Sequence, residues 1–100
     1  MSDDDKLLKA RNDGTIAISI LNDEMVQAAF ASLKSTYSEK LFSTTIDQQG
    51  AREKLYMACR VVDEVQRHLQ AIADNGKLAD QELNRLINEA EAKKKWQDIR

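Results

Sequence analysis

Hydrophobic positions recur at helical spacing along most of this chain. Over residues 22–42 they lie three or four residues apart, which places them on one face of a helix. These positions are Val26, Phe30, Leu33, Tyr37 and Leu41. Asn22 suits the N-cap position, and the acidic residues that follow it suit the first turn. The pattern predicts a helix over 22–42 that ends in the polar, turn-forming residues after Phe42.

A longer helix is predicted over residues 47–75. Its apolar positions alternate steps of three and four residues, which is heptad spacing. They are Leu55, Ala58, Val62, Val65, Leu69 and Ile72. Beside them, Cys59, Val61 and Ala73 widen the apolar stripe where a two-stranded coiled coil normally carries charges. We therefore expect this helix to contact several neighbours in a bundle, and the Asn-Gly pair at 75–76 predicts its left-handed stop.

The remaining segments extend the helical pattern. Residues 78–97 predict a last helix, with an apolar face that contains Ala79, Leu83, Leu86 and Ala90. Residues 1–13 start with aspartates that favour a helix N-terminus but offer little to bury, so a short helix and a frayed end both fit. Residues 15–21 fit a strand or a helix. We expect a helix, because a lone strand would have no pairing partner.

The predicted fold is a single all-α domain over residues 1–100, a helical hairpin or bundle of three to four helices with one long central helix. Its centre is a hairpin of 22–42 against 47–75. The expected hairpin core is Val26, Phe30, Leu33, Tyr37, Leu55, Val62, Val65, Leu69 and Ile72. Such a core is thin for a small domain, so we expect a second copy or a partner protein to cover the remaining apolar face. The candidate surface is Leu83, Leu86, Ala90 and Trp96.

Composition narrows the functional class. Hydrophobic residues make up 42% of the chain and charged residues 32%, and the net charge of −2 does not resemble that of a nucleic-acid-binding polycation. The single cysteine, Cys59, excludes an intramolecular disulfide and suits a reducing compartment. The acidic N-terminus is not a secretory signal, and no apolar run is long enough for a membrane span. We expect a protein that is neither secreted nor inserted in a membrane.

The residues that often carry catalysis or bind metals are sparse. His68 and Glu64 are too few ligands for a tetrahedral metal site. Cys59 and His68 are roughly 13 Å apart along one helix at 1.5 Å per residue, beyond the reach of a hydrogen bond between nucleophile and base. No glycine-rich phosphate loop or metalloprotease motif occurs. The sequence predicts a protein without enzymatic activity, cofactor or metal.

The C-terminal segment suggests a weaker alternative, nucleic-acid binding. Its basic and stacking residues are Lys93, Lys94, Lys95, Trp96 and Arg100. Glu89, Glu91 and Asp98 dilute this positive charge. We therefore favour a charged helix end in which Trp96 is a packing anchor.

The middle of the chain, residues 30–79, resembles small uncharacterised helical proteins of tailed bacteriophages and prophages. The matching features are Phe30, Leu33 and Tyr37, then REKLY at 52–56, VVDEVQRHL at 61–69 and GKLA at 76–79. The resemblance implies an accessory protein of virion assembly or packaging, located in the host cytoplasm or the virion. Its implied partners are further copies of itself or another phage structural protein. It implies no catalytic residue and does not extend beyond Ala79.

Overall fold

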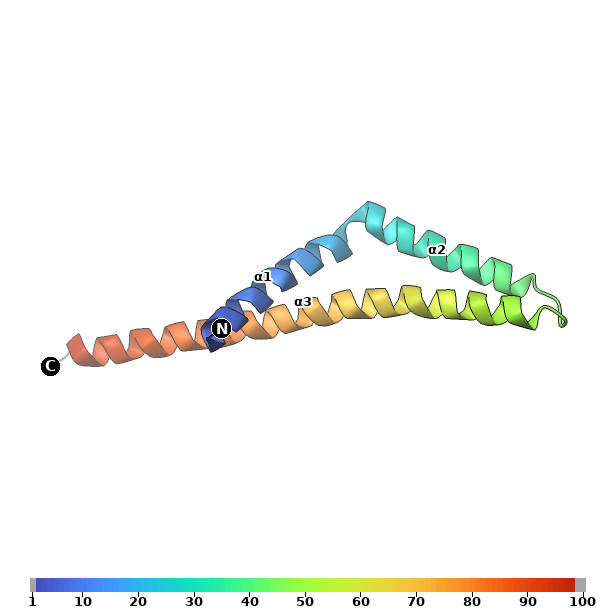
Figure 1. The fold of residues 1–100 in the computed structure, drawn as a ribbon. Helices are drawn as coiled ribbons and strands as arrows, with labels where there is room; N and C mark the ends of the chain where they lie inside the picture. Colours follow the sequence, from blue (N-terminus) through green and yellow to red (C-terminus); the bar gives the residue numbers. More distant parts are fainter. Residues whose placement is uncertain (1, 99–100) are drawn as a thin grey trace. The chain divides into compact units, whose positions relative to one another are not determined.

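The structure, a computed structural model, describes residues 2–98 and is built from three helices (Figure 1). They are α1 (Asp3–Asn22), α2 (Glu24–Phe42) and α3 (Gln49–Asp98). No strand occurs among the described residues, so the all-α class is confirmed. The ambiguous residues 15–21 belong to α1, in agreement with the predicted helix.

Helix α1 begins close to the start of the chain. The hydroxyl of Ser2 accepts a hydrogen bond from the amide of Asp5 at 3.2 Å, which satisfies one of the free amides of the first turn. Asp3, Asp4 and Asp5 follow in that turn, where the helix dipole favours negative charge. Residues 3–13 are therefore helical rather than frayed.

The boundary between α1 and α2 lies one residue later than the spacing predicted. Asp23, with an extended backbone, is the N-cap of α2, and its carboxylate accepts a hydrogen bond from the Val26 amide at 3.0 Å. Asn22, the predicted cap, is instead the last residue of α1. The Gln27 side-chain amide also donates to the Leu21 carbonyl at 2.8 Å, which ties the two helix ends together.

Helix α3 is one continuous helix of 50 residues, so the stop predicted at 75–76 is wrong. The segments 47–75 and 78–97 form a single element. No glycine among the described residues has a positive φ, the backbone state that a left-handed stop requires. Gly76 is buried within the helix, and its missing side chain allows another backbone to approach.

The chain divides into two compact units. The terminal unit combines residues 1–17 with residues 71–100, and the hairpin unit is residues 18–70. Helices α1 and α3 each contribute to both units.

In the terminal unit, α1 packs antiparallel on the second half of α3 through small residues. Gly14 lies against Gly76, and the Arg11 guanidinium is 3.9 Å from the Asp80 carboxylate. Leu7, seven residues before Gly14, is half-buried, and Leu83, seven residues after Gly76, is buried. The buried residues of this unit are Gly14, Ala17, Ala73, Gly76, Ala79 and Leu83.

In the hairpin unit, α2 runs antiparallel to the first part of α3, and the Lys34 ammonium bridges to Asp63 at 3.0 Å. The predicted hairpin core is only partly covered. Val62 is buried, whereas Leu33 and Val65 are 43% and 45% exposed. Five others are half-buried: Val26, Phe30, Tyr37, Leu55 and Leu69. The last predicted core residue, Ile72, is half-buried and belongs to the terminal unit.

Candidate functional site

The most unusual property of this chain is how much surface, including many large apolar side chains, it leaves in contact with solvent. Its accessible surface is 7982 Å². A compact monomer of 11.3 kDa would expose about 5,700 Å². The buried hydrophobic residues of the described chain are few, and three of the five are alanines: Ala17, Val62, Ala73, Ala79 and Leu83. The apolar surface itself is therefore the candidate functional site.

The first half of α3 carries an apolar row, which we call the α3 stripe: Met57, Val61, Val65 and Leu69. The first three are exposed and Leu69 is half-buried. Successive members are four residues apart and so lie on neighbouring turns of one helix face. Met57 and Val61 are 64% and 59% exposed. Val61, Val65 and Leu69 line a shallow groove together with Glu64 and His68.

The tip of the hairpin displays two more large apolar side chains. Phe42, at the end of α2, is 87% exposed, and Ile46, in the connection, is 93% exposed. Hydrogen bonds hold this connection. The Thr45 amide donates to the Gln48 side chain at 2.9 Å, and the Arg52 guanidinium donates to the Thr45 carbonyl. The Thr45 hydroxyl also donates to Asp47 and lowers the pKa of that carboxyl.

The four residues proposed as a partner surface do not lie together on an exposed face. Leu83 is buried in the terminal unit, and Leu86 is half-buried. Ala90 is exposed and Trp96 is 74% exposed. In this unit, α3 continues past the start of α1, so its last described turns have no other helix of the same unit beside them (Figure 1). Leu83 is thus a core residue of the chain, whereas Ala90 and Trp96 are accessible to a partner.

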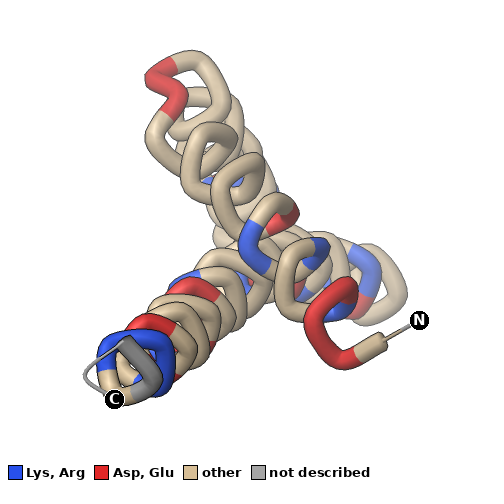
Figure 2. Tube along the Cα trace, turned by 90° about the vertical axis from the view of Figure 1, so that its left-hand side faces the viewer, with Lys and Arg blue, Asp and Glu red and all other residues tan. Residues whose placement is uncertain are grey.

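The basic segment is accessible but mixed in charge. Lys93, Lys94 and Lys95 are exposed beside Trp96, while Arg100 lies outside the described residues. Segments of both signs follow one another along this part of α3 (Figure 2). The described part of this segment therefore carries charges of both signs.

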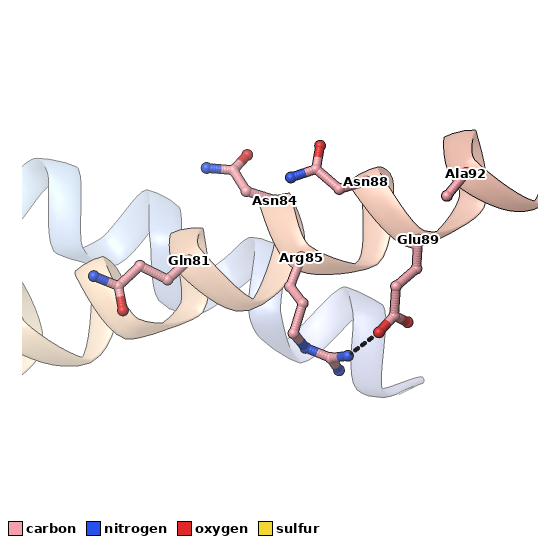
Figure 3. Close-up of a pocket in the computed structure, with 6 residues that line it drawn as sticks. All are labelled: Gln81, Asn84, Arg85, Asn88, Glu89 and Ala92. Atoms are coloured by element: carbon pink, nitrogen blue, oxygen red, sulfur yellow. Dashed lines mark hydrogen bonds and ion pairs between the residues drawn. The ribbon is translucent and has the colours of Figure 1, made fainter.

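One surface depression in the terminal unit is lined by polar residues of α3 alone. Its residues are Gln81, Asn84, Arg85, Asn88, Glu89 and Ala92. In Figure 3, Asn84 and Asn88 lie on one side of the helix, and Arg85 turns toward Glu89 on the other. Arg85 lies 2.5 Å from both Glu89 and Glu82, and the pKa of Arg85 is raised, chiefly by its hydrogen bonds to Glu82. Because one helix supplies every lining residue, a ligand here would remain largely in solvent.

The sequence candidates for chemistry are not brought together. Cys59 is half-buried and His68 is exposed on the same helix, α3. Among the described residues, no group of three or more His, Cys, Asp or Glu side chains could hold a metal ion. The lowered carboxyl pKa values have structural causes. Asp63 accepts a hydrogen bond from Lys34, and Glu82 accepts hydrogen bonds from Arg85.

Within residues 2–98, no single helix has both the length and the apolarity needed to cross a membrane. Helices α1 and α2 pass that test of length and composition only when they are taken together as a bent pair.

The heptad spacing of the sequence indicates that α3 is continuous. The heptad steps do not end at Ile72 but continue through Gly76 and Ala79 to Leu83, Leu86 and Ala90. The same seam runs through residues of both units. Val62 is buried in the hairpin unit, and Gly76, Ala79 and Leu83 are buried in the terminal unit. The α3 stripe begins beside this seam with Met57 and Val61 and joins it at Val65 and Leu69, so heptad spacing alone reveals only half of the stripe.

Comparisons with protein-family models, with curated proteins and with solved structures found no match to this chain. The functional argument therefore depends on the surface of the chain itself.

Proposed function

We propose that this protein works without catalysis, by associating with a second copy of itself to form a helical assembly component. The observation that carries the proposal is the exposed apolar surface. The total accessible area, polar and apolar together, exceeds that of a compact monomer of this mass by roughly 2,000 Å², and large apolar side chains such as Met57, Val61 and Phe42 are among the exposed residues. A stable dimer of standard size buries about 800 Å² from each partner. The excess is thus large enough to supply an interface.

The hairpin unit is the half of a bundle that such an association would complete. Helix α2 has no fully buried residue, and its inward positions are at best half-buried against α3. Two antiparallel hairpins that bury these faces together would form a four-helix bundle with the long α3 helices at its centre. At the other end of α3, Ala90 and Trp96 offer a further accessible surface for a partner.

We place this association in virion assembly or packaging, in the host cytoplasm or in the virion. The support is the resemblance of residues 30–79 to small helical proteins of tailed phages. Another phage structural protein is the second partner that this setting implies.

Thermal unfolding at several protein concentrations tests the proposal. If folding and association are coupled, the unfolding midpoint rises with protein concentration by mass action. We expect a clear rise over a hundredfold range of concentration. A midpoint that stays constant over this range would show that the fold is complete in one chain, against the proposal.

Nucleic-acid binding is the second candidate function. The observation that favours nucleic-acid binding is that Trp96 and the three lysines at 93–95 are all exposed to solvent. Binding through these residues would weaken as salt increases, with a linear decrease of log affinity against log salt concentration. Replacement of all three lysines by glutamate should abolish such binding and leave the unfolding midpoint nearly unchanged. Absence of DNA binding at low salt would eliminate this candidate.

A further inference from the structure

We infer that the second copy lies antiparallel along the α3 stripe, with Val61 of each copy facing Val65 of the partner subunit. This inference depends on the proposed self-association and specifies its surface and direction. The three arguments for it are the spacing of the stripe, the charges beside it and the area that it offers.

The spacing of the stripe is self-complementary. Met57, Val61, Val65 and Leu69 are evenly spaced, so a two-fold axis at the level of residue 63 exchanges Val61 with Val65 and Met57 with Leu69. A two-fold interface requires such a match, because the same surface is used on both subunits. Every apolar member of the row then meets an apolar member of the other copy.

The charges beside the stripe favour the antiparallel direction. Arg60 and Glu64 lie on one flank, and in the single chain their side chains are 3.9 Å apart and exposed to solvent. In the antiparallel pair, each Arg60 is offset from the partner's Glu64 by only two residues, which is about 3 Å along the helix axis. In a parallel, in-register pair the two-fold axis runs along the helices, so the flank with Arg60 and Glu64 would face the opposite flank of the other copy and these pairs between subunits would not form.

The exposed area points to this stripe rather than to the hairpin tip. Phe42 and Ile46 are two side chains at the end of the hairpin, too few for an interface of the size that a stable dimer needs. Two members of the stripe, Val65 and Leu69, belong to the seam of the hairpin unit, and Leu33 on α2 also remains partly exposed. An antiparallel copy would cover the stripe and these residues in one continuous surface.

Disulfide cross-linking between single-cysteine chains tests the register. In a Cys59→Ala background, the variants Val61→Cys and Val65→Cys are prepared separately, then mixed, unfolded, refolded and treated with oxidised glutathione. Facing Cα atoms in a close helix pair are about 4–6 Å apart, within the range of a disulfide. In the proposed pair, Val61 of one copy and Val61 of the partner subunit are offset by four residues along the helix axis, and the same holds for Val65. The Cα atoms of two such identical residues are then about 8 Å apart, too far for a disulfide. Both positions are substantially exposed in the single chain, so the substitutions should not disturb its folding.

We expect a covalent dimer from the mixture of the two variants and none from either variant alone. The control is Leu78→Cys, a position 63% exposed elsewhere on α3, which should not cross-link with Val65→Cys. Cross-links within each single variant would indicate a parallel pair and overturn the inference. If no cross-link forms although sedimentation equilibrium shows a dimer, this register is wrong and the proposed self-association stands. If sedimentation shows only monomer, both proposals fail.

Discussion

Gly14 of α1 and Gly76 of α3 pack directly against each other. A Cβ atom built on either residue would lie 2.6 Å from the Cα of the other, closer than real Cβ atoms approach a backbone. A Cβ on Gly76 would also lie 3.0 Å from the Ala10 carbonyl oxygen. The two helices of the terminal unit therefore touch at their backbones, and only glycine at both positions permits this contact.

This contact predicts that Gly14→Ala and Gly76→Ala each destabilise the protein. Alanine favours a helix over glycine by roughly 1 kcal/mol. The steric conflict with the opposite backbone should outweigh this gain and leave a net loss of about 1–3 kcal/mol, as for other overpacked sites. Urea unfolding at one fixed protein concentration measures the effect.

Gly50 provides the matched control for these substitutions. It lies in the first turn of α3, and a Cβ there would meet nothing within 4 Å. Gly50→Ala should stabilise the protein by about 0.5–1 kcal/mol through helix propensity alone. If the substitutions at Gly14 and Gly76 gave the same gain, the close backbone contact would not exist in solution.

The N-cap of α2 gives a second prediction. Asp23→Ala removes the acceptor for the Val26 amide and should cost about 1 kcal/mol of unfolding free energy. Asn22→Ala is the control, because Asn22 ends α1 and does not cap α2. A larger loss for Asn22→Ala than for Asp23→Ala would place the helix boundary one residue earlier, as the sequence had suggested.

The pair between Lys34 and Asp63 predicts a dependence of stability on pH. The hydrogen bond from Lys34 and the positive charge of Lys34 lower the pKa of Asp63, and Lys34 Nζ lies 3.0 Å from Asp63 Oδ1. A carboxyl with a lower pKa in the folded state stabilises the fold above its unfolded pKa, about 3.9. This stabilisation is lost as the pH decreases through the lower, folded pKa.

Asp63→Asn should therefore reduce stability slightly at neutral pH and have no effect at pH values well below the folded pKa. Both side chains are more than two-fifths exposed, so the effect at neutral pH is small. Thermal unfolding of both proteins across the acid range measures it. A difference between the two proteins that persisted or grew in strong acid would show that Asp63 acts through something other than its charge.

The sequence predicts the helical faces well, because they depend on local spacing. The face of α2 that contains Phe30 and Tyr37 is the one turned toward α3, and both residues are half-buried. Val62, at the middle of the predicted heptad, is the buried residue of the hairpin. Spacing of this kind is set by the geometry of one helix and needs no knowledge of its neighbours.

The break predicted at 75–76 was wrong because local chemistry and tertiary packing disagree there. An Asn-Gly pair favours a helix end when nothing else acts on it. The heptad steps from Ile72 through Gly76 to Ala79 favour continuation, and the contact with Gly14 makes use of the missing side chain. Gly14 is 62 positions away in the sequence, so local patterns could not reveal this contact.

The candidate surface was only partly predictable for a related reason. An apolar face such as that of Leu83 shows that something covers it, but not whether the cover is another helix of the same chain. Here residues of the terminal unit bury Leu83, whereas Trp96, further along α3, stays exposed. The sequence placed Val65 and Leu69 in the seam and Val61 beside it, without indicating that they form the largely exposed α3 stripe. Its exposure follows from where α2 lies on α3.

Absolute molar mass by light scattering, across a wide range of protein concentration and at low and high salt, tests the central claim most directly. Self-association through an apolar surface predicts twice the 11.3 kDa chain mass at high concentration, with little effect of salt. A mass of 11.3 kDa at every concentration would contradict self-association and leave the exposed surface to a different protein.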